Sequence, residues 1–270
     1  MQIKPAYHLA WINRGITAGN SLNYNPQSAV ILQQQFPVSP VVKPNPTLTR
    51  RGYEGKLLCF QEGLKHCLQD THPEGWGLLH QAIGNAHYFQ GKVESDYRKY
   101  WHEAVAEYHQ ALITLTQEAF PEQHLEVVRD LMRVLFGLGK DTEANQWRRH
   151  GLEVFRQLLN SKTTSFQRRQ LEVKFISFSQ MRVDVLVEDG ELVPAIEAAE
   201  RNKNRYLTWI LDAQNQHILS PSYPEIQQLI NPTTAITYWH LSPHALTTFI
   251  IKHGAEEPII LSFPPLARQG

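Results

Sequence analysis

The chain contains few cysteines and no excess of charge of either sign. Only Cys59 and Cys67 occur in 270 residues, and 26 basic side chains balance 26 acidic ones. The two thiols are eight residues apart in a helical pattern, about 12 Å along the axis, which is too far for a disulfide. Two thiols alone do not complete a four-ligand zinc site, so we expect both cysteines to be buried packing residues.

The neutral balance also gives no electrostatic reason to expect binding to nucleic acid or to an anionic membrane. No apolar run approaches the roughly 20 residues that span a bilayer, and the N-terminus lacks the basic-then-apolar order of a secretory signal. The thirteen histidines form no His-x-x-x-His pair in a helical segment. We therefore predict a cytoplasmic protein without a metal or cofactor, whose paired arginines, such as Arg148 and Arg149, lie on solvated helix faces or caps.

Residues 1–52 are rich in Asn, Gln and Pro. Five prolines between positions 26 and 46 remove backbone donors and block helix propagation. The composition predicts a poorly ordered N-terminal segment, in which a short helix near residues 6–16 is the one regular element that the pattern allows.

Residues 53–213 show the apolar spacing of amphipathic helices and repeat it. The sequence PEGW at 73–76 recurs as PEQH at 121–124, and this register aligns Gly91 with Gly139. Gly139 and Gly190 are each followed five residues later by an alanine, as expected for a turn between two helices. Three helix hairpins in one register predict a repeat array.

Small residues in the second helix of each pair explain how the hairpins can pack. Ala104, Tyr108 and Ala111 place a small, an aromatic and a small residue on one helix face. The small residues allow close helix crossing, and the aromatic ring fills the gap to the next hairpin. Because one hairpin cannot bury its apolar face alone, stacking would produce a mainly α, tetratricopeptide-like α-solenoid of about three hairpins.

The pattern changes after the repeats. Residues 214–232 read as a linker with a short helix, bracketed by Pro221, Pro224 and Pro232. Two β-rich runs follow, Ala235–Leu241 and Leu246–Lys252, and their four-residue link predicts an antiparallel hairpin. A further run at 258–263 can add a strand.

These residues resemble a known family. The segments AAERNKNRYLTWILD at 198–212 and NPTTAITYWHLSPHALTTFIIKH at 231–253 are similar to the junction between tetratricopeptide repeats and a CHAT domain, the caspase-like domain of cyanobacterial and other bacterial proteins. The segments at 56–77 and 117–127 also resemble the repeats of those proteins. The resemblance implies that residues 233–270 begin an α/β caspase-like domain.

Members of the wider clan cleave peptides with a His–Cys dyad, in which the imidazole favours the thiolate nucleophile. Residues 233–270 contain no cysteine, and His240, His244 and His253 do not match the position of the family's catalytic histidine. We therefore expect an incomplete, truncated CHAT domain and carry no catalytic residue over to this chain.

The repeat groove is the expected functional surface. In tetratricopeptide repeats the peptide-contacting side chains come from the first helix of each hairpin. Amide and guanidinium groups suit that role, since amides bond an extended backbone and arginines hold a carboxylate. The register places these residues there: Gln81, Asn85, Arg129, Arg133, Gln180 and Asp184.

The sequence thus predicts a non-enzymatic scaffold for protein–protein interaction, whose groove binds a partner peptide or protein. The alternative is the regulatory half of a split or truncated caspase-like cysteine peptidase, with the dyad supplied by another polypeptide. A hairpin with open strand edges also predicts self-association.

Overall fold

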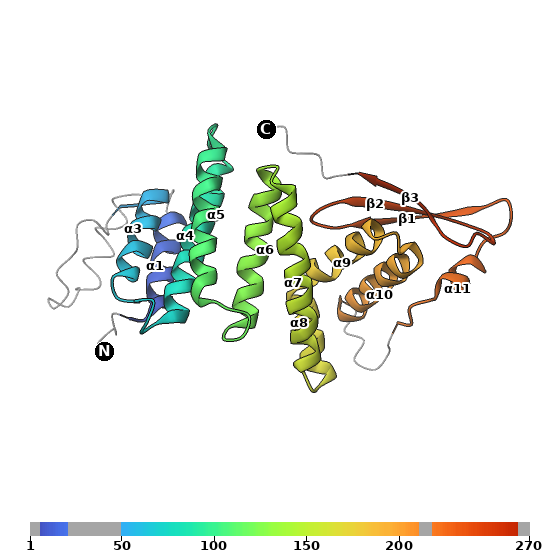
Figure 1. The fold of residues 1–270 in the computed structure, drawn as a ribbon, viewed down its shortest axis with the longest axis horizontal. Helices are drawn as coiled ribbons and strands as arrows, with labels where there is room; N and C mark the ends of the chain where they lie inside the picture. Colours follow the sequence, from blue (N-terminus) through green and yellow to red (C-terminus); the bar gives the residue numbers. More distant parts are fainter. Residues whose placement is uncertain (1–5, 21–49, 211–217, 264–270) are drawn as a thin grey trace, which may run out of the picture. The chain divides into compact units, whose positions relative to one another are not determined.

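The computed structural model describes residues 6–20, 50–210 and 218–263 (Figure 1). Within these ranges it contains ten helices and one three-stranded antiparallel sheet, so the prediction of a mainly helical chain is confirmed. The chain divides into two compact units, residues 1–144 and 145–270. This boundary falls inside the 53–213 segment that the sequence predicts as one array.

The first unit contains five described helices. They are α1 (His8–Asn20), α3 (Gly52–Leu64), α4 (Pro73–Gly91), α5 (Tyr97–Thr114) and α6 (Pro121–Gly137). Helix α1 lies where the pattern allows a short helix near residues 6–16, and it packs on α3: a Cβ on Gly15 would lie 2.2 Å from the Phe60 ring. Residues 21–49 of the predicted poorly ordered segment 1–52 lie outside the described residues.

The starts of α4 and α6 follow from the repeated Pro-Glu sequence. Pro73 and Pro121 occupy the first turn, where no intrahelical partner is needed for a backbone N–H. Glu74 and Glu122 follow in the same turn and face the positive end of the helix dipole. The sequence register between these two helices is therefore a structural register as well.

Helices α4 and α5 cross closely through small residues. Ala104, Tyr108 and Ala111 are fully buried, as their spacing predicts. A Cβ on Gly84 would lie 2.6 Å from the Tyr108 ring, and one on Gly91 would lie 2.5 Å from the Trp101 ring. The two glycines are required because aromatic rings of α5 pack directly against the backbone of α4.

Both cysteines belong to this unit. Cys59 and Cys67 are buried free thiols, and Cys67 lies in a core cluster with Phe60, Leu79 and Ile83. Burial raises the pKa of both thiols. The prediction of buried packing cysteines is confirmed.

The second unit contains the remaining elements. They are α7 (Asp141–Ser161, whose first four residues belong to the first unit), α8 (Ser165–Lys174), α9 (Ile176–Glu188), α10 (Leu192–Ile210), α11 (Tyr223–Gln227), β1 (Ala235–Leu241), β2 (Leu246–Lys252) and β3 (Ile259–Phe263). Gly139 before α7 and Gly190 before α10 both have positive φ, 74° and 79°, which confirms the predicted turns.

The sheet has the order β1-β2-β3, with both pairs antiparallel. Tyr238 pairs with Phe249, and Phe249 pairs with Ile260, so these three residues share one face of the sheet. The predicted hairpin has the observed strand bounds, and the run at 258–263 supplies the third strand.

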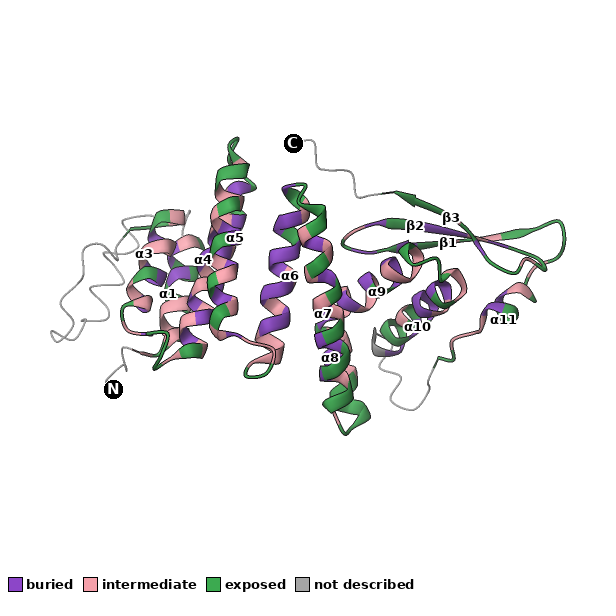
Figure 2. Ribbon diagram, viewed as in Figure 1, coloured by how far each residue is buried: buried purple, intermediate pink, exposed green. Residues whose placement is uncertain are grey.

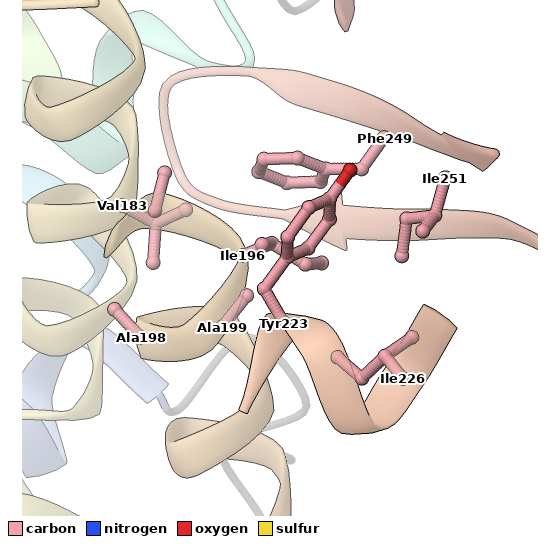
Figure 3. Packing of buried hydrophobic residues seen from close by; sticks show 9 residues of the cluster. Val183, Ile196, Ala198, Ala199, Tyr223, Ile226, Phe249 and Ile251 are labelled. Carbon is pink, nitrogen blue, oxygen red and sulfur yellow. The ribbon is translucent and has the colours of Figure 1, made fainter. Parts of the chain in front are cut away.

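One face of the sheet packs on helices. Phe249 and Ile251 join Val183 of α9, Ile196 of α10 and Tyr223 of α11 in a buried cluster (Figure 3). Figure 2 shows the buried residues of α9 and α10 beneath the sheet, whereas exposed residues recur along β1 and β3. The sheet is thus held to the helices through one face.

Candidate functional site

A cavity of about 470 Å³ lies among four helices of the second unit. Its wall combines five arginines with apolar side chains, and we call it the arginine groove. The lining residues are Arg149, Leu152, Glu153, Phe155, Arg156, Leu159 and Asn160 of α7, Glu172 of α8, Phe178, Ser179, Arg182 and Val185 of α9, and Ala198, Arg201, Asn202 and Arg205 of α10.

Helical spacing brings these side chains onto one side of each helix. Arg149 and Arg156 are seven residues apart on α7, two turns along one face, and Arg201 and Arg205 are one turn apart on α10. Arg182 of α9 lies four residues after Phe178. The groove is therefore a product of three helix faces that converge.

The floor of the groove is aromatic. Phe155 and Phe178 are buried and stack with ring centroids 5.9 Å apart, and Phe175 contacts both rings at 6.1 and 6.2 Å. Ring packing of this kind fixes the spacing between α7 and α9. The arginines of α7 and α9 therefore extend from helices whose spacing is fixed by aromatic packing.

Carboxylates hold four of the five arginines at the rim. Arg149 donates to Asp189 (3.0 Å), and Arg205 lies 2.9 Å from Glu172. Arg156 forms two bonds to Glu153, of 3.0 and 2.8 Å. Arg201 lies 3.7 Å from Glu197. These ion pairs fix the positions of the four guanidinium groups and leave them exposed to solvent.

Arg182 differs from the other four. It is exposed and has no acidic partner within the described part of the chain. The lining contains five arginines against two glutamates, and with Asp189 and Glu197 counted there is still one positive charge in excess. The groove therefore favours an anionic group near Arg182.

Three of the residues predicted for peptide binding meet at one carboxylate in the first unit. Gln81 donates to Asp130 (3.3 Å), and so does Arg129 (3.3 Å), while Arg133 lies 3.7 Å from the same carboxylate. Asp130 is buried. The carboxylate that the two arginines were expected to receive from a partner is thus supplied internally.

Asn85 has a comparable internal role. It accepts a hydrogen bond from the Tyr108 hydroxyl (2.8 Å), which ties α4 to α5. Burial and the nearby Asp130 raise the pKa of Tyr108, so the phenol remains a donor at neutral pH. This contact gives Asn85 a structural role within the hairpin of α4 and α5.

The last two predicted residues, Gln180 and Asp184, face the sheet. The Gln180 carbonyl accepts from His240 Nε2 (3.1 Å). Asp184 is only 3% exposed, which corrects the expectation that it lies on an accessible groove surface. The face of α9 that carries these two residues packs under β1 and β2, and the opposite face lines the arginine groove.

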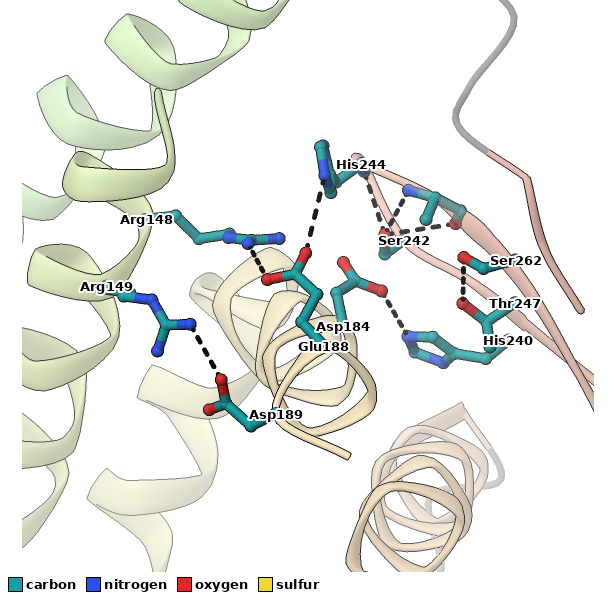
Figure 4. A network of polar contacts seen from close by, with 11 residues as sticks. Arg148, Arg149, Asp184, Glu188, Asp189, His240, Ser242, His244, Thr247 and Ser262 are labelled. Carbon is teal, nitrogen blue, oxygen red and sulfur yellow. Dashed lines mark hydrogen bonds and ion pairs between the residues drawn. The ribbon is translucent and has the colours of Figure 1, made fainter. Parts of the chain in front are cut away.

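Asp184 belongs to a network of polar groups between the helices and the sheet (Figure 4). His240 Nε2 lies 3.8 Å from Asp184 Oδ1, and His244 Nε2 lies 4.0 Å from Glu188 Oε1. Arg148 forms an ion pair with Glu188. We call Arg148, Asp184, Glu188, His240, Ser242 and His244 the sheet-docking network.

Some buried polar atoms of the network have no hydrogen-bond partner among the described residues. Neither oxygen of Asp184 accepts a well-formed hydrogen bond among the described residues, and Nε of Arg148 is likewise unmatched. Burial raises the pKa of Asp184 to about 7, although Ser242 and Arg148 oppose the shift, and burial lowers the pKa of His240. At neutral pH His240 is therefore uncharged and Asp184 is partly protonated.

Arg148 was expected on a solvated helix face, and the structure corrects this. Its side chain is fully buried, whereas Arg149 is 55% exposed. Neighbouring residues on a helix point about 100° apart, so one member of an arginine pair can face the interior. The local sequence pattern does not indicate which of the two arginines is buried.

The network contains serine, histidine and aspartate, but it lacks the geometry of a catalytic triad. The Ser242 oxygen accepts from the backbone N–H groups of His244 (3.0 Å) and Ala245 (2.8 Å). His240 Nε2 is bonded to the Gln180 carbonyl. Because no hydrogen bond joins Ser242 to His240 among the described contacts, the pair is not arranged as nucleophile and base.

The described residues contain no group of three or more His, Cys, Asp or Glu side chains placed to hold a metal ion. None of their helices combines the length and hydropathy needed to cross a membrane.

Comparison of the chain with protein-family models, with curated proteins and with solved structures gave no match. The arginine groove and the sheet-docking network must therefore be interpreted from their own chemistry.

Proposed function

We propose that the chain is a protein–protein interaction scaffold of the tetratricopeptide and CHAT type, and that its arginine groove binds an acidic segment of a partner protein. The helix pairs and the positive-φ turns at Gly139 and Gly190 support a solenoid-like repeat arrangement. The observation that carries the function is the aromatic-floored cavity rimmed by five arginines.

The chemistry of the groove favours a particular kind of segment. Guanidinium groups bind carboxylates with paired, charge-assisted hydrogen bonds, and the exposed arginines present such donors. The apolar floor formed by Phe155 and Phe178 favours an aliphatic or aromatic side chain beside those carboxylates. We therefore infer a ligand segment that combines Asp or Glu with a large apolar residue.

The carboxylates already at the rim do not prevent this binding. The side chains of Arg149, Arg156 and Arg205 are between 55 and 65% exposed, and ion pairs in water contribute about 0–1 kcal/mol each. A ligand carboxylate can therefore join or replace a rim contact at little cost, and Arg182 is open to receive the first one.

We place binding here rather than at Arg129 and Arg133 because those two side chains contact the buried Asp130. A partner carboxylate there would have to compete with one that is fixed in the fold. The arginine groove supplies guanidinium groups around an existing cavity instead.

Selection from a random peptide display library tests the proposal. The full chain is immobilised as wild type, as Arg156→Glu with Arg182→Glu, and as Arg98→Glu. Arg98 is an exposed arginine of the first unit, so its variant tests whether a charge reversal outside the groove affects selection. We expect the wild type and Arg98→Glu to enrich the same acidic and apolar motif, and the groove variant to lose it.

A wild-type chain that enriches no common motif would contradict the proposal. So would a motif that the groove variant retains, since binding would then use another surface. Circular dichroism of each variant verifies that the helices are intact.

A further inference from the structure

The three-stranded sheet has a second face that no described residue covers. Side chains alternate across a strand, so the residues between those that pack on the helices point the other way. They are predominantly large and apolar, and we call them the outer sheet face: Trp239, Leu241, Leu246, Ile259, Leu261 and Phe263.

The strand register makes this face continuous. Trp239 pairs with Thr248, and Thr248 pairs with Leu261, which gives one row across the sheet. Leu241, Leu246 and Phe263 form the neighbouring row by the same register. Trp239, Leu241 and Phe263 are 74, 69 and 56% exposed, so the rows together form one accessible apolar patch.

An antiparallel sheet with one face in water normally alternates apolar and polar residues. Strands β1 and β3, AITYWHL and IILSF, contain no lysine, arginine, aspartate or glutamate. They also lack the charges and prolines by which edge strands avoid unwanted pairing. The sequence of the sheet is thus suited to burial on both faces.

The absence of charge makes the face compatible with a second copy of the chain. A two-fold symmetric interface brings the same patch of two copies together, so a charged residue near its centre would face the same charge on the other copy. In the strands of this sheet the charged residue is Lys252, at the end of β2. The outer sheet face can therefore meet a second copy of itself without repulsion at its centre.

We propose that the outer sheet face is a homodimer interface, in which the sheets of two copies pack face to face. Covering six side chains of this size removes on the order of 600 Å² per copy from water, near the roughly 800 Å² per partner of a standard interface. Two sheets packed in this way lie about 10 Å apart. The interface lies on β1 to β3 and does not depend on ligand binding in the arginine groove.

Sedimentation velocity of the full chain between 1 and 100 µM tests the proposal. We expect a monomer–dimer equilibrium for the wild type. Trp239→Glu combined with Leu261→Glu should weaken the dimer at least tenfold, because each charge would be buried against apolar surface. Leu219→Glu combined with Leu229→Glu is the matched control, since these residues are 86 and 75% exposed but lie outside the sheet, and this variant should dimerise as the wild type does.

A wild type that stays monomeric at 100 µM would overturn the proposal, and so would a polydisperse aggregate in place of a dimer. A double variant that dimerises as the wild type does would also overturn it, because association would then use a strand edge or another surface. Far-UV circular dichroism establishes that the double variant is folded. If the double variant is unfolded, Trp239→Ser replaces it, because this substitution removes the largest exposed side chain without adding charge. A dimer dissociation constant equal to that of the wild type would then overturn the proposal.

Discussion

The buried carboxylate of Asp184 should make the stability of the chain fall as the pH rises through neutrality. The folded chain raises the pKa of this group from 3.8 to about 7 because the side chain is buried. The folded state therefore holds the proton more tightly than the unfolded state does. The stabilisation is fully present below pH 3.8 and is lost as the pH rises through about 7.

The size of the effect follows from the two pKa values. A difference of about three units corresponds to roughly 4 kcal/mol in the free energy of unfolding, of which about 2–3 kcal/mol falls between pH 5 and pH 8. Asp184→Asn keeps the shape of the protonated acid and does not ionise. The variant should therefore gain about 2–3 kcal/mol relative to the wild type over that interval.

Urea denaturation of both proteins at several pH values, followed by far-UV circular dichroism, measures this difference. Comparing the two proteins at each pH cancels the titration of groups that do not interact with Asp184. Asp189→Asn is the control: Asp189 is exposed, and its bond to Arg149 lowers its pKa below 3.8, so its stability difference from the wild type should stay constant from pH 5 to pH 8. A stability difference between Asp184→Asn and the wild type that stays constant from pH 5 to pH 8 would refute the reasoning.

Three further outcomes can be measured on the same chain. Burial lowers the pKa of His240, so this group costs stability as the pH falls below 6.5, and His240→Gln should lessen the loss of stability in urea titrations at pH 5. Gly84→Ala should lower the free energy of unfolding by about 1–3 kcal/mol, because the new methyl group meets the Tyr108 ring at 2.6 Å; an unchanged urea midpoint would contradict this. Cys59 and Cys67 should react with a thiol reagent only in denaturant, since both are buried with raised pKa values, and rapid labelling of the native chain would be inconsistent with that packing.

The sequence predicted those elements whose signal is local. The hairpin of β1 and β2 follows from two β-rich runs and a short link, and its strand bounds agree with the prediction. The turns at Gly139 and Gly190 follow from the need for positive φ. Ala104, Tyr108 and Ala111 were identified as a packing face because small residues at helical spacing allow close helix crossing and the aromatic ring fills the remaining gap.

The features that were missed depend on contacts between distant residues. Helix α1 extends to Asn20, four residues beyond the short helix that the sequence pattern allows, and it packs against α3. Arg148 and Asp184 are ionisable side chains, yet tertiary packing buries both. Spacing on α7 and α10 could have indicated the arginine groove, but the prediction considered only the first helix of each hairpin.

The central claim is that the arginine groove recognises a carboxylate of a partner segment, and a charge exchange tests it most directly. The peptide enriched by the wild type is labelled, and its affinity is measured by fluorescence anisotropy for the wild type and for Arg182→Glu. We expect Arg182→Glu to bind at least tenfold more weakly, and a peptide whose facing Glu is replaced by Lys to recover affinity for this variant alone. Equal affinity of the original peptide for both proteins would contradict the claim.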